Sequence, residues 1–205
     1  MPSRTKRVYF GDYVFFVDEN VYEPTEDSFL FAENLDVKEG ETVLDMGTGC
    51  GILGVLAAKK AVSVLAVDVN PHALRCAKEN AEVHDTRSKM SFLRGDLFAP
   101  LGEHAKFDVV LFNAPYLPSV EGEGISWVER AWAGGASGRE VIDRFIQQVP
   151  THLRPSGRVL LLQSNLAGLD ETVERFALYG MHARIVAERV LPLFETLFLL
   201  EARIG

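Results

Sequence analysis

The residues best suited to chemistry lie in one short stretch, where a mostly apolar run ends in Asn113, Ala114, Pro115 and Tyr116. The run at residues 107–112 predicts a buried central strand of a parallel sheet. Ligands of open α/β sheets bind outside the carboxyl ends of the strands. An amide, a backbone carbonyl and an aromatic ring are therefore expected at a binding site. Taken alone, Asn-x-Pro-Tyr is equally consistent with a plain turn after a strand.

A glycine-rich turn at residues 47–51 follows a predicted strand at 41–45 and precedes a predicted helix at 52–60. Glycines let a backbone approach a cofactor closely, and the start of a helix offers free N–H groups. The dinucleotide fingerprint counted from Gly47 needs a glycine where this chain has Ile52. No lysine follows the turn as a phosphate-binding loop would need. The pattern indicates a nucleotide-type cofactor other than a dinucleotide.

Acidic residues follow three predicted strands in succession. Asp68 follows Asp45 at about the 20-residue separation expected when a second-strand carboxylate reaches the hydroxyls of a ribose. Asp96 comes after a predicted strand at 89–94, where a carboxylate could accept a hydrogen bond from the amino group of an adenine. Asn113 ends the fourth strand. Such a series is hard to obtain by chance, and it predicts one cofactor site along this edge of the sheet.

The rest of the chain alternates strand and helix patterns, which predicts an α/β, Rossmann-like fold. Further strands are expected at 62–67, 157–163, 184–190 and 196–202, and further helices at 71–84, 137–152 and 170–178. This order gives a seven-stranded, mostly parallel sheet with a reversed terminal strand and helices on both faces.

Asn70 with Pro71 is expected to cap the helix at 71–84, and Thr25 to cap a helix that has Glu26 and Asp27 in its first turn. Residues 119–136 are expected to form a substrate-side loop or lid. Residues 7–17 read as a hairpin that covers the core, within an N-terminal cover at 1–20. We expect one domain over residues 1–205.

The composition is that of an ordinary globular protein, with 47% hydrophobic and 24% charged residues. The formal charge of −8 argues against unaided binding of nucleic-acid phosphates, although a local basic patch or a basic partner stays open. No segment has the apolar length of a membrane span and no signal peptide is recognised, so a cytoplasmic location is expected by default. Cys50 and Cys76 lack metal-ligand spacing, and no metal site is predicted.

Two sequence blocks are more specific than the glycine turn: V-Y-E-P-T-E-D-S-F-L at 21–30 and A-W-A-G-G-A-S-G-R-E-V-I-D-R-F at 131–145. The stretch D-M-G-T-G-C-G at 45–51 resembles motif I of class I S-adenosylmethionine-dependent methyltransferases. Together the three resemble the HemK/PrmC class of glutamine methyltransferases, and in particular its short archaeal and eukaryotic branch. That class modifies the Gly-Gly-Gln loop of translation release factors. The similarity extends over about residues 21–202.

The resemblance implies S-adenosyl-L-methionine as the cofactor and a set of contact residues. Carried over by position, the cofactor contacts are Ser28, Asp45, Gly47, Gly49, Asp68, Asp96, Leu97 and Asn113. Asn113 would face both cofactor and substrate, at the head of the catalytic segment that ends at Tyr116. The family pattern is N-P-P-Y, and Ala114 stands in place of its first proline. Alanine keeps the backbone carbonyl that the family uses and loses the fixed φ, which concerns turn rigidity and substrate preference.

An amide nitrogen is a poor nucleophile because its lone pair is delocalised into the carbonyl. Asn113 Oδ1 and the Ala114 carbonyl can accept its two N–H hydrogens, which raises electron density on the nitrogen and fixes its orientation. Tyr116 can pack against the flat amide. Well-oriented groups of this kind supply roughly 7–11 kcal/mol of barrier reduction in favourable cases. Methyl transfer then depends on alignment rather than on a general base.

Three alternatives use the same residues. We refer to Asn113, the Ala114 carbonyl and Tyr116 as the amide clamp. The amide clamp also serves the exocyclic amines of adenine or guanine in tRNA, rRNA or DNA, where Tyr116 would stack on the base. It could equally serve a lysine of another protein. A cofactor-binding scaffold without activity is the third alternative, and the retention of Asn113, Pro115 and Tyr116 argues against it.

The predicted strand at 89–94 is expected at a sheet edge, with Met90, Phe92 and Leu93 apolar. An exposed apolar edge promotes aggregation unless it is covered, and a strand from another chain is one way to cover it. The resemblance implies a small zinc-binding activator protein at this edge, because the short-branch enzymes commonly bind one. Cover by a loop of the same chain is the alternative. The substrate partner that the resemblance implies is a release factor. No membrane partner is expected, and a nucleic-acid partner is disfavoured.

Overall fold

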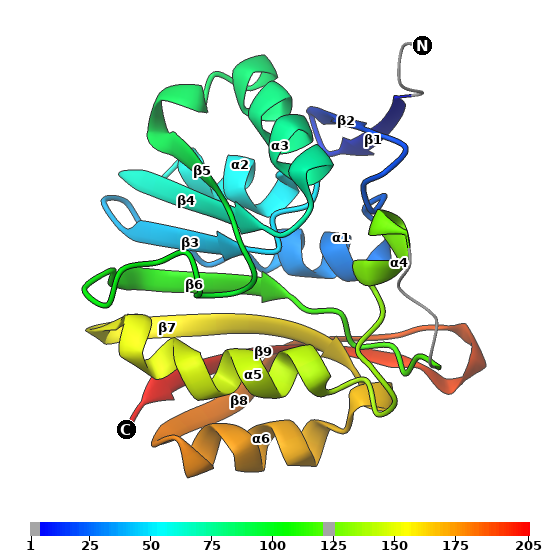
Figure 1. Cartoon of the computed structure of the whole chain (residues 1–205), viewed down its shortest axis with the longest axis vertical. Coiled ribbons are helices and arrows are strands. Elements are labelled where there is room, and N and C mark those ends of the chain that lie inside the picture. The colour runs from blue at the N-terminus through cyan, green and yellow to red at the C-terminus, as the bar shows by residue number, and fades with distance from the viewer. Residues whose placement is uncertain (1–4, 121–125) are drawn as a thin grey trace.

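The computed structural model describes residues 5–120 and 126–205, and a seven-stranded sheet forms its centre (Figure 1). The strands lie in the order β5-β4-β3-β6-β7-β9-β8. Their bounds are Thr42–Met46 (β3), Ser63–Asp68 (β4), Met90–Arg94 (β5), Phe107–Asn113 (β6), Leu153–Ser164 (β7), Met181–Val190 (β8) and Thr196–Ile204 (β9). Neighbouring strands are parallel except that β9 runs antiparallel to β7 and β8. The predicted fold class, with its reversed terminal strand, is confirmed.

Helices cover both faces of this sheet (Figure 1). One face carries α1, α2 and α3, and the other carries α5 and α6. The helix bounds are Glu26–Glu33 (α1), Ile52–Ala58 (α2), Pro71–Val83 (α3), Trp127–Arg130 (α4), Glu140–Gln148 (α5) and Leu169–Leu178 (α6). Short 3-10 turns occupy Arg87–Lys89, Val149–His152, Asn165–Ala167 and Pro192–Phe194. No helix within the described ranges is long and apolar enough to cross a membrane.

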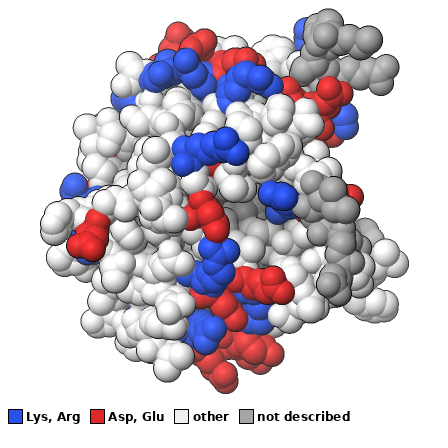
Figure 2. All heavy atoms as spheres, in the orientation of Figure 1, with Lys and Arg blue, Asp and Glu red and all other residues white. Residues whose placement is uncertain are grey.

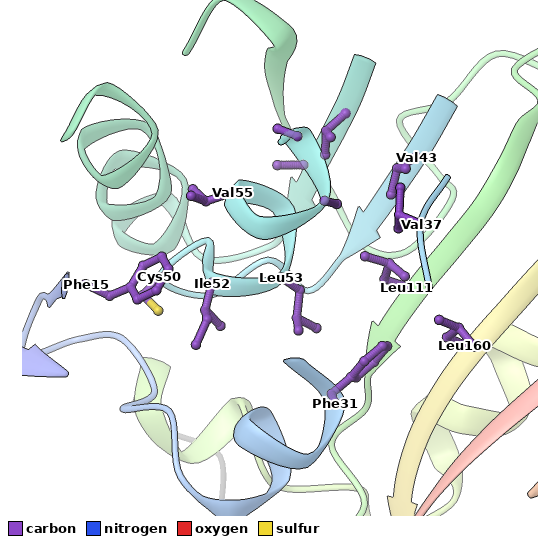
Figure 3. Packing of buried hydrophobic residues seen from close by; sticks show 14 of the residues in the cluster. Phe15, Phe31, Val37, Val43, Cys50, Ile52, Leu53, Val55, Leu111 and Leu160 are labelled. Atoms are coloured by element: carbon purple, nitrogen blue, oxygen red, sulfur yellow. The ribbon is translucent and has the colours of Figure 1, made fainter. Parts of the chain in front are cut away.

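The alternation of side chains along β6 explains why its sequence is apolar almost throughout. Val109 and Leu111 belong to the core layer under α1 and α2, whereas Val110 and Phe112 belong to the layer under α5. Figure 3 shows Leu111 on the first of these layers, where it lies among buried side chains from the helices and neighbouring strands. β6 is therefore held rigidly from both faces, and its last residues are delivered to a fixed place.

The N-terminal strands β1 (Lys6–Phe10) and β2 (Tyr13–Val17) pair in antiparallel fashion outside the main sheet. The backbone of Phe16 bonds twice to the Asn80 side chain of α3, with 2.8 Å from Phe16 N to Asn80 Oδ1 and 2.8 Å from Asn80 Nδ2 to Phe16 O. Phe15 and His84 pack ring to ring. We propose that this hairpin and the sheet form one domain, because the hairpin's buried side chains belong to the α2–α3 core layer.

The second half departs from the predicted bounds in three places, one of which is β8, which begins at Met181 rather than at 184. The helix predicted at 137–152 begins at Glu140, because residues 134–139 form a glycine-rich turn, and it ends at Gln148 in a 3-10 turn that contains Pro150. β7 begins at Leu153 rather than at 157, with an irregular register against the start of β6. Residues 121–125 of the predicted lid at 119–136 lie outside the described residues, and α4 forms within the remainder.

Candidate active site

A cavity of about 410 Å³ lies at the carboxyl ends of β3, β4 and β6. Its volume falls within the roughly 300–1,000 Å³ range of small-molecule sites. All but one of the residues predicted from the sequence line it, namely Ser28, Gly47, Gly49, Asp68, Asp96, Leu97, Asn113, Ala114, Pro115 and Tyr116. The exception is Asp45. Trp127 and Trp132 of the predicted lid also line the cavity.

The glycine-rich turn after β3 packs so closely against its neighbours that a side chain at Gly51 would collide with them. Gly51 has a φ of +86°, and a Cβ there would lie 2.9 Å from the Cα of Ala77 in α3. The N–H groups of Gly47 and Thr48 donate to the Val67 carbonyl of β4, at 2.8 and 3.1 Å. The turn is thus clamped between β4 and α3, with its backbone exposed to the cavity.

Asp68, at the end of β4, holds the turn from the other side. Its Oδ2 accepts from the Gly49 N–H at 3.0 Å, and its Oδ1 accepts from the Asn70 N–H at 2.8 Å. Burial raises the pKa of the Asp68 carboxyl, against the opposing effect of these hydrogen bonds. Asn70 caps α3, with its Oδ1 accepting from the His72 N–H, as the sequence predicts. Asp68 is therefore not needed as a cap, and it lines the cavity.

Asp45 lies beneath the turn and is not among the residues that line the cavity. Its predicted role as a direct cofactor contact stays a prediction. The alternation along β3 turns its side chain toward α2, on the face that carries Val43. Its Oδ2 accepts from Thr48 Oγ1 at 2.6 Å. Burial raises the pKa of Asp45 to about 7, although hydrogen bonds from Thr48 and the Gly54 backbone act in the opposite direction. Asp45 thus supports the turn through Thr48.

The side-chain amide of Asn113, at the end of β6, is hydrogen-bonded to described residues through its nitrogen but not through its oxygen. Its Nδ2 donates to Asp27 Oδ2 at 3.1 Å and to Ser28 Oγ at 3.3 Å, both in the first turn of α1. Its Oδ1 is buried and accepts no hydrogen bond from any described residue. A buried acceptor without a partner is costly and uncommon, so this oxygen is suited to an N–H group of a bound molecule.

Asp27 is the site residue that sequence reasoning missed. It was expected only as an acid in the first turn of a helix, with Thr25 as the cap. Thr25 does occupy the cap position, but its hydroxyl bonds to Asp27 Oδ1 at 2.9 Å rather than to the backbone. Asp27 also accepts from the Ser28 N–H and from Tyr22 OH, and its side chain is buried. The available signal was the polar set of Tyr22, Thr25 and Ser28 around one acid.

Tyr22 and Tyr116 stand beside Asp27 as neutral phenols. Burial, and then the Asp27 carboxylate, raise the pKa of both hydroxyls above the ordinary tyrosine value. Neither can therefore serve as a base near neutral pH. Tyr116 is half-buried and packs against both core layers, which leaves its ring as a wall of the cavity.

Ala114 has a backbone N–H group, which proline lacks. Its backbone N–H donates to the Leu162 carbonyl of β7 at 3.3 Å, and its side chain is buried. The carbonyl that the family pattern requires is retained. This hydrogen bond provides a constraint on the turn that proline would provide through its ring.

The second sequence block supports the turn from outside. The Leu117 N–H donates to the Trp132 carbonyl at 3.0 Å, and the Gly134 N–H donates back to the Leu117 carbonyl at 2.8 Å. A Cβ at Gly134 would lie 2.7 Å from the Pro115 carbonyl oxygen, and one at Gly138 only 2.3 Å from that of Tyr116. Positions 134 and 138 require glycine because the backbone there lies directly against the backbone of residues 115–116.

Asp96 and Leu97 lie beside β5's carboxyl end. The Asp96 carboxylate is half exposed and forms an ion pair with Arg144 of α5 at 2.5 Å. A ligand in the cavity would therefore share this carboxylate with Arg144. Leu97 is buried with a φ of +47°, an uncommon conformation for leucine, and it lines the cavity next to Val69. An apolar wall and a carboxylate at this end suit a flat heterocycle with an amino group.

These groups fit S-adenosylmethionine as a whole. We propose that Asp68 contacts the ribose hydroxyls of the cofactor, the backbone of Gly47 and Gly49 its amino-acid part, and Leu97 its base. We also propose that the Asn113 Oδ1, which has no partner among the described residues, holds the substrate nitrogen.

The comparisons with known proteins agree with this fit. Residues 18–127 match the family model "Methyltransferase small domain". A candidate protein N5-glutamine methyltransferase of Methanocaldococcus jannaschii is 42% identical over 184 residues, which cover 89% of this chain and 91% of the relative. Methyltransferase HEMK2 of Homo sapiens is 36% identical over 182 residues, covering 83% of this chain and 84% of the relative.

A solved structure gives the same result. It is described as the E. cuniculi Mtq2–Trm112 complex responsible for methylation of the eRF1 translation termination factor. The matched chain is 28% identical, with a TM-score of 0.71, and the match covers 91% of this chain and 99% of that one. The chain therefore belongs to the methyltransferase small domain family, and within it to the HemK-like protein glutamine methyltransferases, whose cofactor is S-adenosylmethionine.

Proposed function

We propose that this chain methylates the side-chain amide nitrogen of the glutamine in the Gly-Gly-Gln loop of a translation release factor. The observation that carries this proposal is the buried Asn113 Oδ1, which has no partner among the described residues while its Nδ2 is bound twice. A primary amide supplies the N–H that this oxygen lacks. Relatives named as release factor glutamine methyltransferases, and the eRF1-methylating complex, support the choice of substrate. On the face drawn in Figure 2, Lys and Arg side chains are interspersed with Asp and Glu, which favours a protein substrate over unaided binding of nucleic acid.

The amide clamp would work through orientation. Asp27 and Ser28 hold Asn113 Nδ2, so that Oδ1 faces the substrate and accepts one N–H of the glutamine amide. The Ala114 carbonyl accepts the other. Both bonds strengthen as the nitrogen gains positive charge during attack, which lowers the barrier selectively. S-adenosylmethionine supplies the electrophilic methyl group when bound. Tyr116, neutral through its raised pKa, flanks the flat amide without competing for its proton.

The cofactor would be held mainly by Asp68 and the glycine turn. Asp68 would accept hydrogen bonds from the ribose hydroxyls while it keeps the Gly49 N–H. Ser28, Gly47 and the backbone of Gly49 would surround the amino-acid part, and Asp96 with Leu97 the adenine. Asp45 would act indirectly, through Thr48. A release-factor substrate also implies that the enzyme acts in the cytoplasm, where translation terminates.

We also propose that a small partner chain covers β5. This strand lies at the sheet edge with β4 as its one neighbour among the described strands, as the sequence predicts. Phe92 and Leu93 are half-buried, and Arg87 lies over the Phe92 ring at 5.3 Å. The matched complex contains Trm112 as a second protein. The resemblance further suggests that such a partner binds zinc and activates the enzyme.

The test is a transfer assay with isotopically labelled cofactor. The purified chain, alone and with a candidate partner, is incubated with a cognate release factor or with the same factor lacking the loop glutamine. We expect label on the loop glutamine and none on the altered factor, as located by mass spectrometry. Label on tRNA, rRNA or lysine with an unlabelled factor would contradict the proposal.

A further inference from the structure

The loop between β8 and β9 presents large apolar side chains to solvent. Leu193 is 93% exposed and Phe194 95%, and Val190 at the end of β8 is 75% exposed. A single exposed apolar residue is normal on a protein surface, but three within five positions form a patch that marks interaction sites. We refer to Val190, Leu193 and Phe194 as the apolar tip.

The apolar tip is held in shape. Leu193 and Phe194 have φ values of +63° and +66°, a left-handed conformation that is unfavourable for residues other than glycine. Asn165 maintains it, since its Nδ2 donates to the Phe194 carbonyl at 3.2 Å and its Oδ1 accepts from the Thr196 N–H at 2.8 Å. The Leu191 N–H closes the loop on the Glu195 carbonyl at 2.8 Å. The exposure of the tip is therefore a built feature.

The apolar tip lies near the carboxyl ends of β6 and β7, on the side of the sheet where the active-site cavity is found (Figure 1). Asn165, which holds it, comes directly after β7, and β7 pairs with β6 up to Asn113. Glu195 is near enough to act electrostatically on Tyr22 and Tyr116. Arg189 forms ion pairs of 2.7 Å with Glu26 and Glu33 of α1. Figure 1 shows the β8–β9 hairpin projecting past the carboxyl ends of β6 and β7, on the side of the molecule that carries α4.

We propose that the apolar tip is a docking anchor for the substrate protein, packing into an apolar depression of the release factor beside the loop that carries the glutamine. The inference rests on the proposed function and adds a second contact to it. A loop of three residues with flexible flanks gives little binding area by itself, so a protein substrate needs contacts on the rim around the cavity mouth. The apolar tip lies on the same side of the sheet as the cavity and presents apolar surface for such a contact.

Two other occupants fit the surroundings less well. An anionic membrane would be repelled by Glu188 and Glu195, which flank the tip. A second copy of the chain would need far more contact than one loop offers, since stable interfaces bury about 1,200 Å² or more in total. A folded protein that already places a loop in the cavity needs only one further anchor. Binding energy at such contacts concentrates in a few anchor residues, and aromatic side chains such as Phe194 are enriched at interfaces.

The experiment compares steady-state kinetics on full-length release factor for three enzymes. They are the parent, the double variant Leu193→Ser with Phe194→Ser, and the control Leu178→Ser. Leu178 is 70% exposed at the end of α6, just before β8 begins at Met181, and so lies at the opposite end of the strands from the cavity. We expect the double variant to raise KM for the factor about tenfold or more with kcat unchanged, because only binding common to ground and transition states is lost. The control should match the parent.

Cofactor affinity, measured by calorimetry, must be the same in all three enzymes, which shows that the fold is intact. A photo-crosslinking amino acid in place of Phe194 gives an independent measurement on a minimally altered enzyme. It should crosslink to the release factor, whereas the same group in place of Leu178 should not.

The outcomes separate this inference from the proposed function. If the parent labels the factor and the double variant has an unchanged KM, the docking role is wrong and the proposed function stands. A crosslink only to a second copy, or binding of the parent but not the variant to phosphatidylserine vesicles, would also overturn it. If the parent leaves the factor unlabelled, the proposed function itself fails, and the identity of the docked partner fails with it.

Discussion

The two ends of the cavity differ in how their polar groups are satisfied. At the cofactor end, both oxygens of Asp68 accept backbone N–H groups of this chain, and Asp45 supports the glycine turn from beneath. At the amide end, Asn113 is bound through Nδ2 alone, and its buried Oδ1 has no partner among the described residues. One end is largely complete in itself, and the other is complete only with a bound substrate.

This difference suggests that binding and turnover are separable in this enzyme. Polar groups that already have hydrogen-bond partners form a fixed surface. A cofactor that binds there loses little free energy to the ordering of side chains. An unsatisfied acceptor aimed at the nucleophile contributes most when charge develops there. Substitutions at the cofactor end should therefore change affinity, and those at the amide end should change rate.

Asn113→Ala should give the largest effect. Loss of the oriented acceptor should lower kcat by about 100- to 1,000-fold, the range seen when one preorganised transition-state hydrogen bond is removed. Affinity for S-adenosylmethionine should change by less than about threefold, since Asp68 and the turn are untouched. Single-turnover assays and calorimetric titration measure the two quantities. A loss of affinity as large as the loss of rate would abolish the distinction between the two ends.

The pH dependence of stability should report the buried acid beneath the cofactor end. The pKa of Asp45 is raised to about 7 in the folded chain, against about 3.9 when unfolded. Its contribution to stability is thus fully present below pH 4 and is lost as the pH rises through 7. Between pH 5 and 8 this should lower the free energy of unfolding by about 2–3 kcal/mol. Urea denaturation at both pH values should show a smaller fall for Asp45→Asn, and an identical fall would contradict the assignment.

Asp68→Ala should weaken cofactor binding without a comparable loss of rate at saturation. Removal of charge-assisted hydrogen bonds costs about 1.5–3 kcal/mol, or roughly ten- to a hundredfold in Kd. The Gly49 N–H also loses its acceptor. Calorimetry gives Kd, and kcat is measured at saturating cofactor. Equal affinity in variant and parent would remove Asp68 from the cofactor site.

Asp27→Asn tests whether the amide end depends on its second layer of contacts. The substitution keeps the size of the side chain but can set an amide donor against Asn113 Nδ2, so the orientation of Asn113 is no longer fixed. We expect kcat to fall about tenfold, the equivalent of one lost hydrogen bond to a charged group. Asp170→Asn, an exposed acid in the first turn of α6, is the matched control. An unchanged kcat in Asp27→Asn would mean that Asn113 is positioned by other contacts.

Ala114→Pro should have the smallest effect. Proline cannot donate to the Leu162 carbonyl, which removes a hydrogen bond worth about 0.5–1.5 kcal/mol. The stiffer unfolded chain offsets part of this loss, by about 0.4–1 kcal/mol. Urea unfolding should therefore show a net change below about 1 kcal/mol, with kcat within about twofold of the parent. A tenfold change in kcat would show that the turn controls alignment at the amide end.

Much of the fold could be predicted because its signals are local. The run in β6 is apolar on both faces because helices cover both. Acids mark the carboxyl ends of three strands, since Asp45 is the penultimate residue of β3, Asp68 is the last of β4 and Asp96 comes two residues after β5. Parallel strands end on one side, so their terminal residues had to meet there. The start of α5 and the start of β7 were less accurate. Gly135 and Gly138, both at positive φ, form a turn before α5, and the 3-10 turn that contains Pro150 leads directly into β7.

The sequence by itself determined which chemical groups reach the cavity and which family the chain resembles, since both follow from residue type and position along each strand. Only the tertiary structure decided how those groups are used. Asp27 meets Asn113 across a separation of 86 residues because α1 docks against the end of β6, and no local pattern encodes that contact. Asp45 turns beneath the loop for a similar reason, since α2 packs over its face of β3. Hydrogen bonds need atoms within about 3 Å, and packing alone sets such distances.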